Sequence, residues 1–347
     1  MNTLGRINIY RRKIMQLLTR NVGAARFDKF NTALKPDIQR ILISRPNGRL
    51  GNLLLITPLV QELTQAFPNS KIDLFVKGGL APIIFKNYPN IDRIIRLPGK
   101  PFKQLLEYAK TWIRLRAKRY DIVLNVDKGS SSGRLSTKFS RSRHKFFGDI
   151  PDEIIAQYPD YIHMAKMPVY NLRNYIGRGQ EAGNPVPVMD IRLNAEELAD
   201  AKRVLHDLVG NDKKTICIFT FATGSKMYSE EWWNEMYSRL LLQFPEYNVV
   251  EILPKENVSQ IRFKALSWYS TNIRQIAAFM ANTEVFIGAD SGMMHLASAA
   301  QIPVIGLFHI TMKDKYVPYN GKSIGVDTDK ISAEEIINLL AGMLPPK

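Results

Sequence analysis

The sequence predicts an α/β protein of two domains, each with a parallel sheet covered by helices. Short β-branched runs alternate with helical stretches along most of the chain, a pattern typical of strands joined by helical crossovers. The chain has 347 residues, which suits two domains of roughly 150 residues better than one core. Near the middle, the segment 177–188 holds three glycines and two prolines, so we place the interdomain linker there.

In the first half, the run Arg40–Ser44 is typical of a buried strand and marks the expected start of ordered structure. A turn at 45–51 precedes a helix expected over 52–67, which Pro58 should kink because proline has no backbone N–H. The other elements expected in this half are a strand at 71–76, a helix at 102–119 and a strand at 121–126.

The second half repeats this alternation. We expect strands at 214–220, 247–253, 284–288 and 303–308, and helices at 195–208, 229–244, 272–281 and 291–300. A last helix should follow Ser332, which opens a capping box with Glu335. Open parallel sheets bind ligands beyond the carboxyl ends of their strands, so both halves should present loops to a cleft between them.

The predicted domain division has four parts: a basic N-terminal extension (1–38), a first domain (39–180), a second domain (181–325) and a C-terminal helical segment (326–347). The extension mixes basic and apolar residues. It is expected either to form an amphipathic helix that touches an anionic membrane or to dock on the protein as an ordinary terminal helix.

The apolar content predicts a cytoplasmic, soluble protein that is at most peripheral on a membrane. Basic residues interrupt the start of the chain at 11–13, and no later run approaches the ~20 apolar residues that span a bilayer. The single cysteine, Cys217, fits a reducing compartment.

The charge of the chain argues for an anionic partner. There are 48 Lys and Arg against 32 Asp and Glu, a net charge of +16, which favours nucleic acid, an anionic lipid surface or a phosphorylated substrate. The basic residues are spread out rather than interleaved with aromatic ones, so we do not expect nucleic acid as a partner.

The strongest local motif is Asp290-Ser291-Gly292, between the expected strand 284–288 and the expected helix 291–300. Asp290 or Ser291 would cap the helix, and the free amides at its start would form an anion site suited to a diphosphate. His295 lies one turn further on and could point at the same pocket. The alternative is a capped helix with a buried histidine and no ligand.

Two further loops could contribute to the same cleft. In the loop 220–226, Thr223 and its neighbours supply donors and Lys226 a charge for a phosphate, unless this is simply a polar loop. The turn 48–52 faces the cleft from the first domain, unless it is only a glycine-rich helix start. The basic stretch 138–145 could grip an acidic glycan or be a solvated face.

The sequence gives no sign of a metal or cofactor. Asp327-Thr328-Asp329 has a two-carboxylate spacing, but it lies just before the capping box and is interpreted as a turn. Five scattered histidines and one cysteine form no metal-binding cluster. We therefore expect no metal and no cofactor.

Three blocks of the sequence resemble the bacterial lipopolysaccharide heptosyltransferases, glycosyltransferase family 9. The first, at 41–68, includes Leu50-Gly51 and the Thr57-Pro58 step, and the second, at 220–233, includes Lys226. The third, at 273–308, includes Asp290-Ser291-Gly292 and is the most specific. The resemblance covers about residues 40–310, whereas 1–38 have no clear counterpart.

The resemblance implies a GT-B fold, in which two Rossmann-like domains with parallel sheets face a central cleft and a last helix often returns to the first domain. It implies a metal-independent, inverting transfer of heptose from ADP-heptose to a lipid A–core acceptor. The partners would be a nucleotide-sugar donor and a phosphorylated glycolipid acceptor, with possible contact at the cytoplasmic face of the inner membrane.

The resemblance also implies roles for individual residues. Lys226 and the Asp290-Ser291-Gly292 turn would hold the donor diphosphate, and His295 would support that turn. The full set of candidate donor-binding residues is Thr223, Lys226, Glu256, Asp290, Ser291, Gly292, His295 and Thr311, with Glu256 placed near the ribose. The candidate acceptor-binding residues are Arg49, Lys128, Arg141 and Arg143.

One position departs from the family. Asn52 stands where the family usually has an Asp that acts as catalytic base, and an amide cannot take up a proton at neutral pH. Asp127, after the expected strand 121–126, is the nearest alternative base. The departure leaves two other functions open: a non-catalytic nucleotide-sugar-binding homologue and a sugar-nucleotide epimerase of the same fold.

Overall fold

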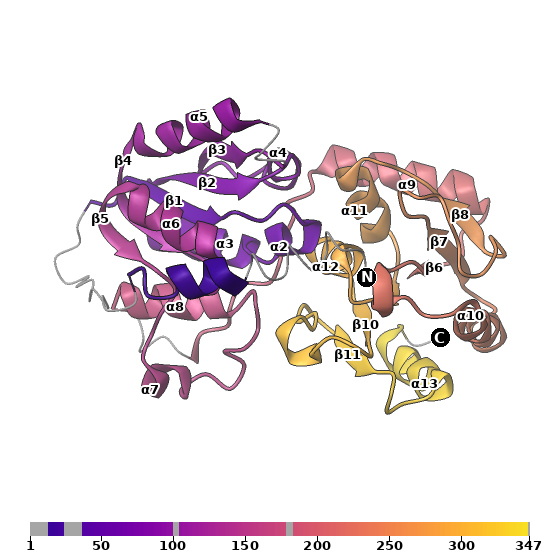
Figure 1. The fold of residues 1–347 in the computed structure, drawn as a ribbon. Coiled ribbons are helices and arrows are strands. Elements are labelled where there is room, and N and C mark those ends of the chain that lie inside the picture. The colour runs from indigo at the N-terminus through magenta and orange to yellow at the C-terminus, as the bar shows by residue number, and fades with distance from the viewer. Residues whose placement is uncertain (1–12, 24–36, 100–103, 178–182, 346–347) are drawn as a thin grey trace.

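The computed structural model describes residues 13–23, 37–99, 104–177 and 183–345, which form two α/β domains side by side (Figure 1). The first domain has a five-stranded sheet of order β3-β2-β1-β4-β5, and the second a six-stranded sheet of order β11-β10-β9-β6-β7-β8. Every neighbouring pair of strands is parallel. The predicted fold class is therefore confirmed.

Both faces of the first sheet are covered by helices, so its central strand β1 is apolar on both sides. Leu42 packs with Phe75 and Val123 on one face, whereas Ile41 and Ile43 join the main core on the other. The strands are β1 (Arg40–Arg45), β2 (Lys71–Lys77), β3 (Ile91–Leu97), β4 (Arg119–Asn125) and β5 (Arg141–Phe146). The helices are α2 (Leu50–Leu54), α3 (Thr57–Ala66), α4 (Ala81–Ile84), α5 (Leu105–Arg116), α6 (Ser131–Phe139), α7 (Asp152–Ile155) and α8 (Met167–Tyr175).

The single kinked helix expected over 52–67 is two helices, α2 and α3, and that prediction was wrong. Pro58 lies in the first turn of α3, where its missing N–H costs nothing. Thr57 Oγ1 donates to the Leu54 carbonyl at 2.8 Å and satisfies a group that the end of α2 leaves free. The break makes α2 a separate short helix that meets the second domain.

The second domain follows the prediction closely. Its strands are β6 (Thr215–Phe219), β7 (Asn248–Ile252), β8 (Leu266–Trp268), β9 (Val285–Ala289), β10 (Val304–Phe308) and β11 (Ile324–Asp327). Its helices are α9 (Ala195–Val209), η4 (Gly224–Lys226), α10 (Glu230–Gln243), α11 (Ile273–Ala281), α12 (Gly292–Ala299), η5 (Lys313–Lys315) and α13 (Ala333–Met343). The capping box at Ser332 is present, and α13 packs on α10 of this domain rather than returning to the first.

The start of the chain docks on the first domain. In the described residues 13–23, a helix at 13–19 lies against the loop after β4, where Gln16 Nε2 donates to Gly129 O at 3.2 Å. Arg134 Nε donates to the Val22 carbonyl at 3.0 Å. Residues 1–12 and 24–36 of the predicted extension, Phe102, and residues 178–182 of the predicted linker fall outside the described residues.

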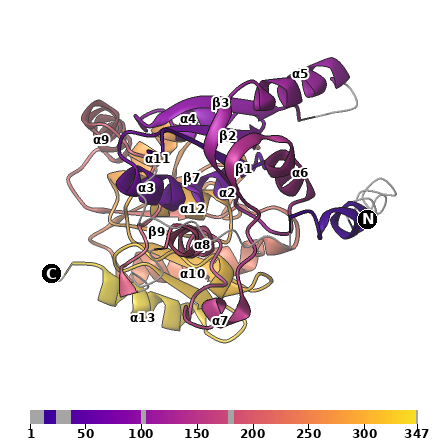
Figure 2. The same cartoon turned by 90° about the vertical axis from the view of Figure 1, so that its left-hand side faces the viewer.

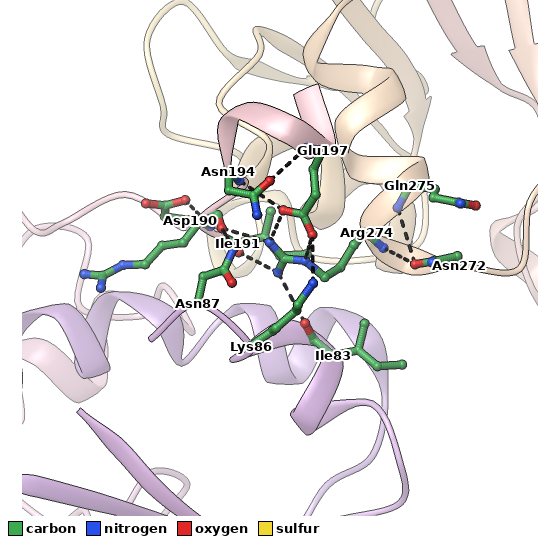
Figure 3. A network of polar contacts seen from close by, with 11 residues as sticks. Ile83, Lys86, Asn87, Asp190, Ile191, Asn194, Glu197, Asn272, Arg274 and Gln275 are labelled. Atoms are coloured by element: carbon green, nitrogen blue, oxygen red, sulfur yellow. Dashed lines mark hydrogen bonds and ion pairs between the residues drawn. The ribbon is translucent and has the colours of Figure 1, made fainter. Parts of the chain in front are cut away.

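The guanidinium of Arg274 joins the second domain to the first (Figure 3). It forms a two-armed ion pair with Glu197 of α9, at 2.5 and 2.7 Å, which lowers the pKa of that carboxyl to about 2. It also donates to the carbonyls of Ile83, in the first domain, and of Ile191 and Arg192, in the segment that precedes α9. Arg274 is 5% exposed, so these contacts are shielded from water.

We predict that Arg274→Met lowers the free energy of unfolding by about 3 kcal/mol at neutral pH, because Glu197 loses two charge-assisted hydrogen bonds and three backbone carbonyls lose their donor. The loss should shrink as the pH falls from 4.5 towards 2, since the paired carboxyl has the depressed pKa and its contribution disappears on protonation. Urea unfolding at several pH values measures it. Arg239→Met, which removes an exposed pair with Glu235, should cost less than about 1 kcal/mol; equal losses would contradict the account.

Candidate active site

The candidate site lies where each sheet reverses its winding. In the first sheet β1 and β4 are neighbours although their connections lead in opposite directions, and in the second sheet β6 and β9 are such a pair. Loops beyond the carboxyl ends of such strands diverge and leave room for a ligand. Asn52, Asp127, Lys226 and Asp290 follow these four strands in order, so the topology brings the main candidates to matching places.

Lys226 and Asp290 meet, as the sequence analysis required. Lys226 Nζ donates to Asp290 Oδ2, which joins the loop after β6 to the turn after β9. Asp290 is 5% exposed, whereas the lysine side chain is partly open to solvent. The carboxylate therefore holds a partly exposed ammonium group in one position.

The start of α12 is less open to an anion than predicted. Ser291 is the N-cap, and its Oγ accepts from the amides of Met293 at 3.2 Å and Met294 at 3.4 Å. Those two amides are therefore not available to a ligand. Within the described part of the chain, the amides of Ser291 and Gly292 have no acceptor. Of the four backbone amides at the start of α12, two are therefore available to an anion.

His295 supports the turn from inside the protein. It is buried, and burial lowers its pKa to about 4 despite the nearby Asp290 carboxylate. Its Nε2 lies 4.0 Å from Asp290 Oδ1, and its Nδ1 has no hydrogen-bond partner in the described structure. The imidazole is therefore neutral at pH 7 and adds no positive charge to the site.

Two glycines let the N-terminal ends of α2 and α12 approach each other across the domain boundary. A Cβ at Gly51 would lie 2.6 Å from His295 Cδ2, and a Cβ at Gly292 would lie 3.1 Å from Leu50 Cβ. Both distances are shorter than ordinary van der Waals contacts. Only residues without a side chain fit this boundary without displacement.

On the first-domain side, Arg45 holds both candidate catalytic residues. Its guanidinium donates to Asp127 Oδ2 at 2.7 Å and to Asn52 Oδ1 at 3.0 Å. Arg45 is 5% exposed, whereas Asp127 is partly exposed and also accepts from the Gly129 amide at 3.0 Å. The structure thus brings Asn52 and Asp127 together through an arginine to which the sequence analysis gave no role.

Tyr316 is a second residue that the sequence analysis missed. Its ring centroid lies 6.1 Å from that of His295. Burial, and then the charge of Asp290, raise the pKa of its hydroxyl, whereas Arg45 and Arg49 lower it. Its hydroxyl therefore lies among charges from both domains, which the irregular segment around η5 gave no pattern to predict.

Three other donor-binding candidates lie on loops at the carboxyl edge of the second sheet. Thr223 precedes η4 and is exposed, Glu256 is exposed after β7, and Thr311 is half-buried after β10. No described hydrogen bond or ion pair joins these three to Lys226 or Asp290. They stay predictions for the rim of the site.

A buried carboxyl links two of these loops. Glu251 of β7 accepts from Thr220 Oγ1 at 2.5 Å and from Ser259 Oγ at 2.7 Å. Burial raises the pKa of Glu251. This network, also missed in the sequence, connects the Lys226 loop to the loop that carries Glu256.

The four acceptor-binding candidates separate into two pairs. Arg49, just before α2, and Lys128, next to Asp127, are exposed beside the site. Arg141 pairs with the first residue of β4, six residues before the carboxyl end of that strand, or roughly 20 Å from the site edge. Arg143 follows it on β5. The structure does not bring Arg141 and Arg143 to the site, because the basic stretch begins an edge strand.

Asp327 and its neighbours form the turn that was predicted. Asp327 pairs with Lys330 at 3.0 Å and accepts from the Asp329 amide at 3.2 Å. The described residues contain no group of three His, Cys, Asp or Glu side chains arranged for a metal, and independence of metal stays a prediction. None of the described helices combines the length and the apolar character needed to cross a bilayer.

Two parallel-sheet domains with paired loops at their reversal points form the GT-B architecture. The model of glycosyltransferase family 9 (heptosyltransferase) matches residues 108–336. The chain therefore belongs to glycosyltransferase family 9.

Relatives support this assignment. Lipopolysaccharide heptosyltransferase 3 of Escherichia coli K12 is 24% identical over 287 residues, which are 75% of this chain and 80% of the relative. Among solved structures, a family 9 glycosyl transferase from Veillonella parvula has a TM-score of 0.68 at 17% identity, covering 89% of this chain and 99% of that one. E. coli heptosyltransferase WaaC with ADP has a TM-score of 0.63 at 16% identity, covering 88% and 100%. These structures share the fold.

We predict that Gly51→Ala destabilises the protein by about 1–3 kcal/mol, because the new methyl group would displace His295 or α2. Thermal unfolding measures it. The matched control is Gly342→Ala in α13, where a Cβ meets nothing within 4 Å. That change should leave stability equal or raise it by up to about 1 kcal/mol, since alanine favours helix. If both variants behave alike, the boundary is not tight.

Proposed function

We propose that this chain is an inverting glycosyltransferase that moves heptose from ADP-heptose to a lipopolysaccharide core acceptor. This proposal rests on the Lys226–Asp290 ion pair at the boundary of the two domains. The pair lies beside the backbone amides of Ser291 and Gly292, which have no acceptor in the described structure. A diphosphate is the ligand that a fixed ammonium group and a helix start suit best.

The proposed chemistry uses this arrangement in the bond-breaking step. Cleavage of the sugar–phosphate bond leaves negative charge on the departing diphosphate. Lys226 and the amides of Ser291 and Gly292 stabilise that charge without reorganising, because they are held in place before the reaction. The role of Asp290 is to position the lysine, since a carboxylate does not itself bind phosphate.

Asp127 is the proposed base. Asn52 cannot accept a proton, but Arg45 places Asp127 next to it. In an inverting transfer, the acceptor hydroxyl attacks the anomeric carbon while its proton passes to a base. Asp127 would take that proton, and Asn52 and Arg45 would position the carboxylate.

The donor and acceptor assignments rest on the relatives and on the basic residues of the site. One solved relative is the E. coli heptosyltransferase WaaC with ADP-2-deoxy-2-fluoro heptose. We place Glu256 at the ribose, with Thr223 and Thr311 on the same rim. Arg49, at the start of α2, and Lys128, which follows Asp127, are both exposed and would contact a phosphorylated glycolipid. The protein would act in the cytoplasm, at the inner leaflet of the inner membrane.

The test is incubation with ADP-heptose, or with uridine- and guanosine-diphosphate sugars, in the presence and absence of truncated core lipopolysaccharide. Release of ADP only with acceptor, together with a glycan heavier by one heptose, is the expected result. Conversion of the donor sugar without acceptor would instead indicate an epimerase. Tight donor binding with no product under any condition would favour a non-catalytic homologue, which the amide at position 52 makes the main alternative.

We predict that Lys226→Met weakens ADP binding by about 10- to 100-fold, the loss typical of one charge-assisted hydrogen bond. Titration calorimetry measures the dissociation constant. Lys330→Met is the control, because that lysine pairs with Asp327 in the turn before α13, and it should bind ADP as the wild type does. An unchanged affinity of Lys226→Met would remove Lys226 from the donor site.

We predict that Asp127→Asn lowers kcat by about 10²- to 10⁴-fold, the usual contribution of a general base. The dissociation constant of ADP should stay within about twofold, since in this account Asp127 contacts the acceptor and not the donor. Adding Asn52→Asp to Asp127→Asn should restore part of the rate, because a carboxylate then lies beside Arg45 again. A wild-type kcat in Asp127→Asn would exclude it as the base.

A further inference from the structure

The N-terminal helix at 13–19 exposes its apolar side chains. Ile14, Leu17 and Leu18 are 56%, 60% and 69% exposed, and their spacing of three and four residues places them on one face. The opposite face carries Thr19, which is buried, and Gln16, which bonds to Gly129. The helix is thus attached by its polar side and presents its apolar side outward.

Helix α5 repeats this arrangement. Leu106 and Ile113 are 79% and 70% exposed, and their spacing of seven residues places them on one side of the helix. Thr111 and Leu115, on the opposite side, are buried against the sheet. The leucine and isoleucine therefore point away from the domain.

These two helices and α6 share one side of the first domain. The rings of Trp112 in α5 and Phe139 in α6 lie 5.6 Å apart, and Phe139 is itself half exposed. Arg134 of α6 donates to Val22, just after the N-terminal helix. In Figure 2, α5, α6 and the N-terminal helix follow one another down the right-hand edge. We call this surface the outer helical face.

The outer helical face also carries exposed basic side chains, which are Lys110, Arg114 and Arg116 on α5 and Lys138 on α6. Together, α5 and α6 contain five Lys and Arg against one Glu, a net charge of +4. Lys13 and Arg20 are exposed beside the apolar side chains of the N-terminal helix. Apolar and cationic side chains therefore occur together on this surface.

We propose that the outer helical face binds the surface of an anionic phospholipid bilayer. Exposed leucine and isoleucine side chains would enter the boundary between headgroups and acyl chains, and the flanking lysines and arginines would contact lipid phosphates. Nucleic acid would satisfy the charges but would leave the apolar side chains in water, so a bilayer fits the surface better.

This surface is joined to the acceptor side of the candidate site. Gln16 of the N-terminal helix bonds to Gly129, which in turn donates to the Asp127 carboxylate. If the proposed function holds, membrane binding would bring a membrane-anchored acceptor to Asp127. The binding itself does not depend on that function.

The experiment is sedimentation of the full chain with vesicles of phosphatidylcholine alone or with about one quarter phosphatidylglycerol. We expect binding to the anionic vesicles that weakens with salt. The double variant Leu17→Ser, Leu18→Ser should lose about tenfold or more in affinity. The double variant Lys13→Glu, Arg20→Glu should lose about 25-fold, at roughly fivefold for each basic residue.

Matched changes on the second domain serve as controls. Two exposed leucines lie on α10, Leu241 and Leu242, and two exposed basic residues lie on α9, Lys202 and Arg203. We expect two control variants to keep more than half of the wild-type affinity for anionic vesicles: Leu241→Ser with Leu242→Ser, and Lys202→Glu with Arg203→Glu.

Three results would overturn the proposal: no binding to anionic vesicles, a Leu17→Ser, Leu18→Ser variant that binds as the wild type does, or tighter binding to duplex DNA than to vesicles at equal phosphate. Sedimentation needs no sugar transfer. A chain that binds vesicles but transfers no heptose would therefore contradict the proposed function and leave this inference standing.

Discussion

The close approach of α2 and α12 is the constraint on which the rest of the site depends. Each helix starts just after a central strand of its own sheet, so each start marks the point where that sheet reverses. Gly51 and Gly292 allow the two starts to meet with His295 and Leu50 between them. Because of this contact, Arg45 and Asp127 from one domain face Tyr316 and Asp290 from the other.

The charges of the site are arranged in pairs that keep each group in place. Lys226 is held by Asp290, and Asp127 by Arg45, while burial keeps His295 neutral. Fixed charges of this kind stabilise a developing charge better than mobile ones, since they need no reorganisation. Away from the site, Arg274 pairs with Glu197 and also donates to the Ile83 carbonyl of the first domain, so the relative placement of the two halves has support of its own.

The sequence predicted the parts of this molecule that follow local rules. The strand–turn–helix at 285–292 and the loop at Lys226 lay where expected, because a buried apolar run followed by small polar residues has few other structures. The second domain was predicted more completely than the first for the same reason. In the first domain β3 and β5 carry charged residues, Arg93 and Arg96 or Arg141 and Arg143, and such strands have no apolar run to reveal them.

The parts that were missed depend on contacts between distant segments. Whether Ser291 caps its own helix or leaves the amides free is a choice of rotamer that composition does not determine. The joining of Asn52 to Asp127 through Arg45 spans 82 residues at its longest, and only the strand order shows that these loops are neighbours. Tyr316 lies in an irregular segment without periodicity. In each case the contact depends on the tertiary structure, which local sequence patterns do not reveal.

The most direct test of this account is a crystal structure of the protein with ADP. The account predicts the β-phosphate at the boundary between α2 and α12, within hydrogen-bonding distance of Lys226 Nζ and of the Gly292 amide, with Asp127 on the opposite side of the cleft. A diphosphate bound elsewhere, with Lys226 still engaged only by Asp290, would contradict it.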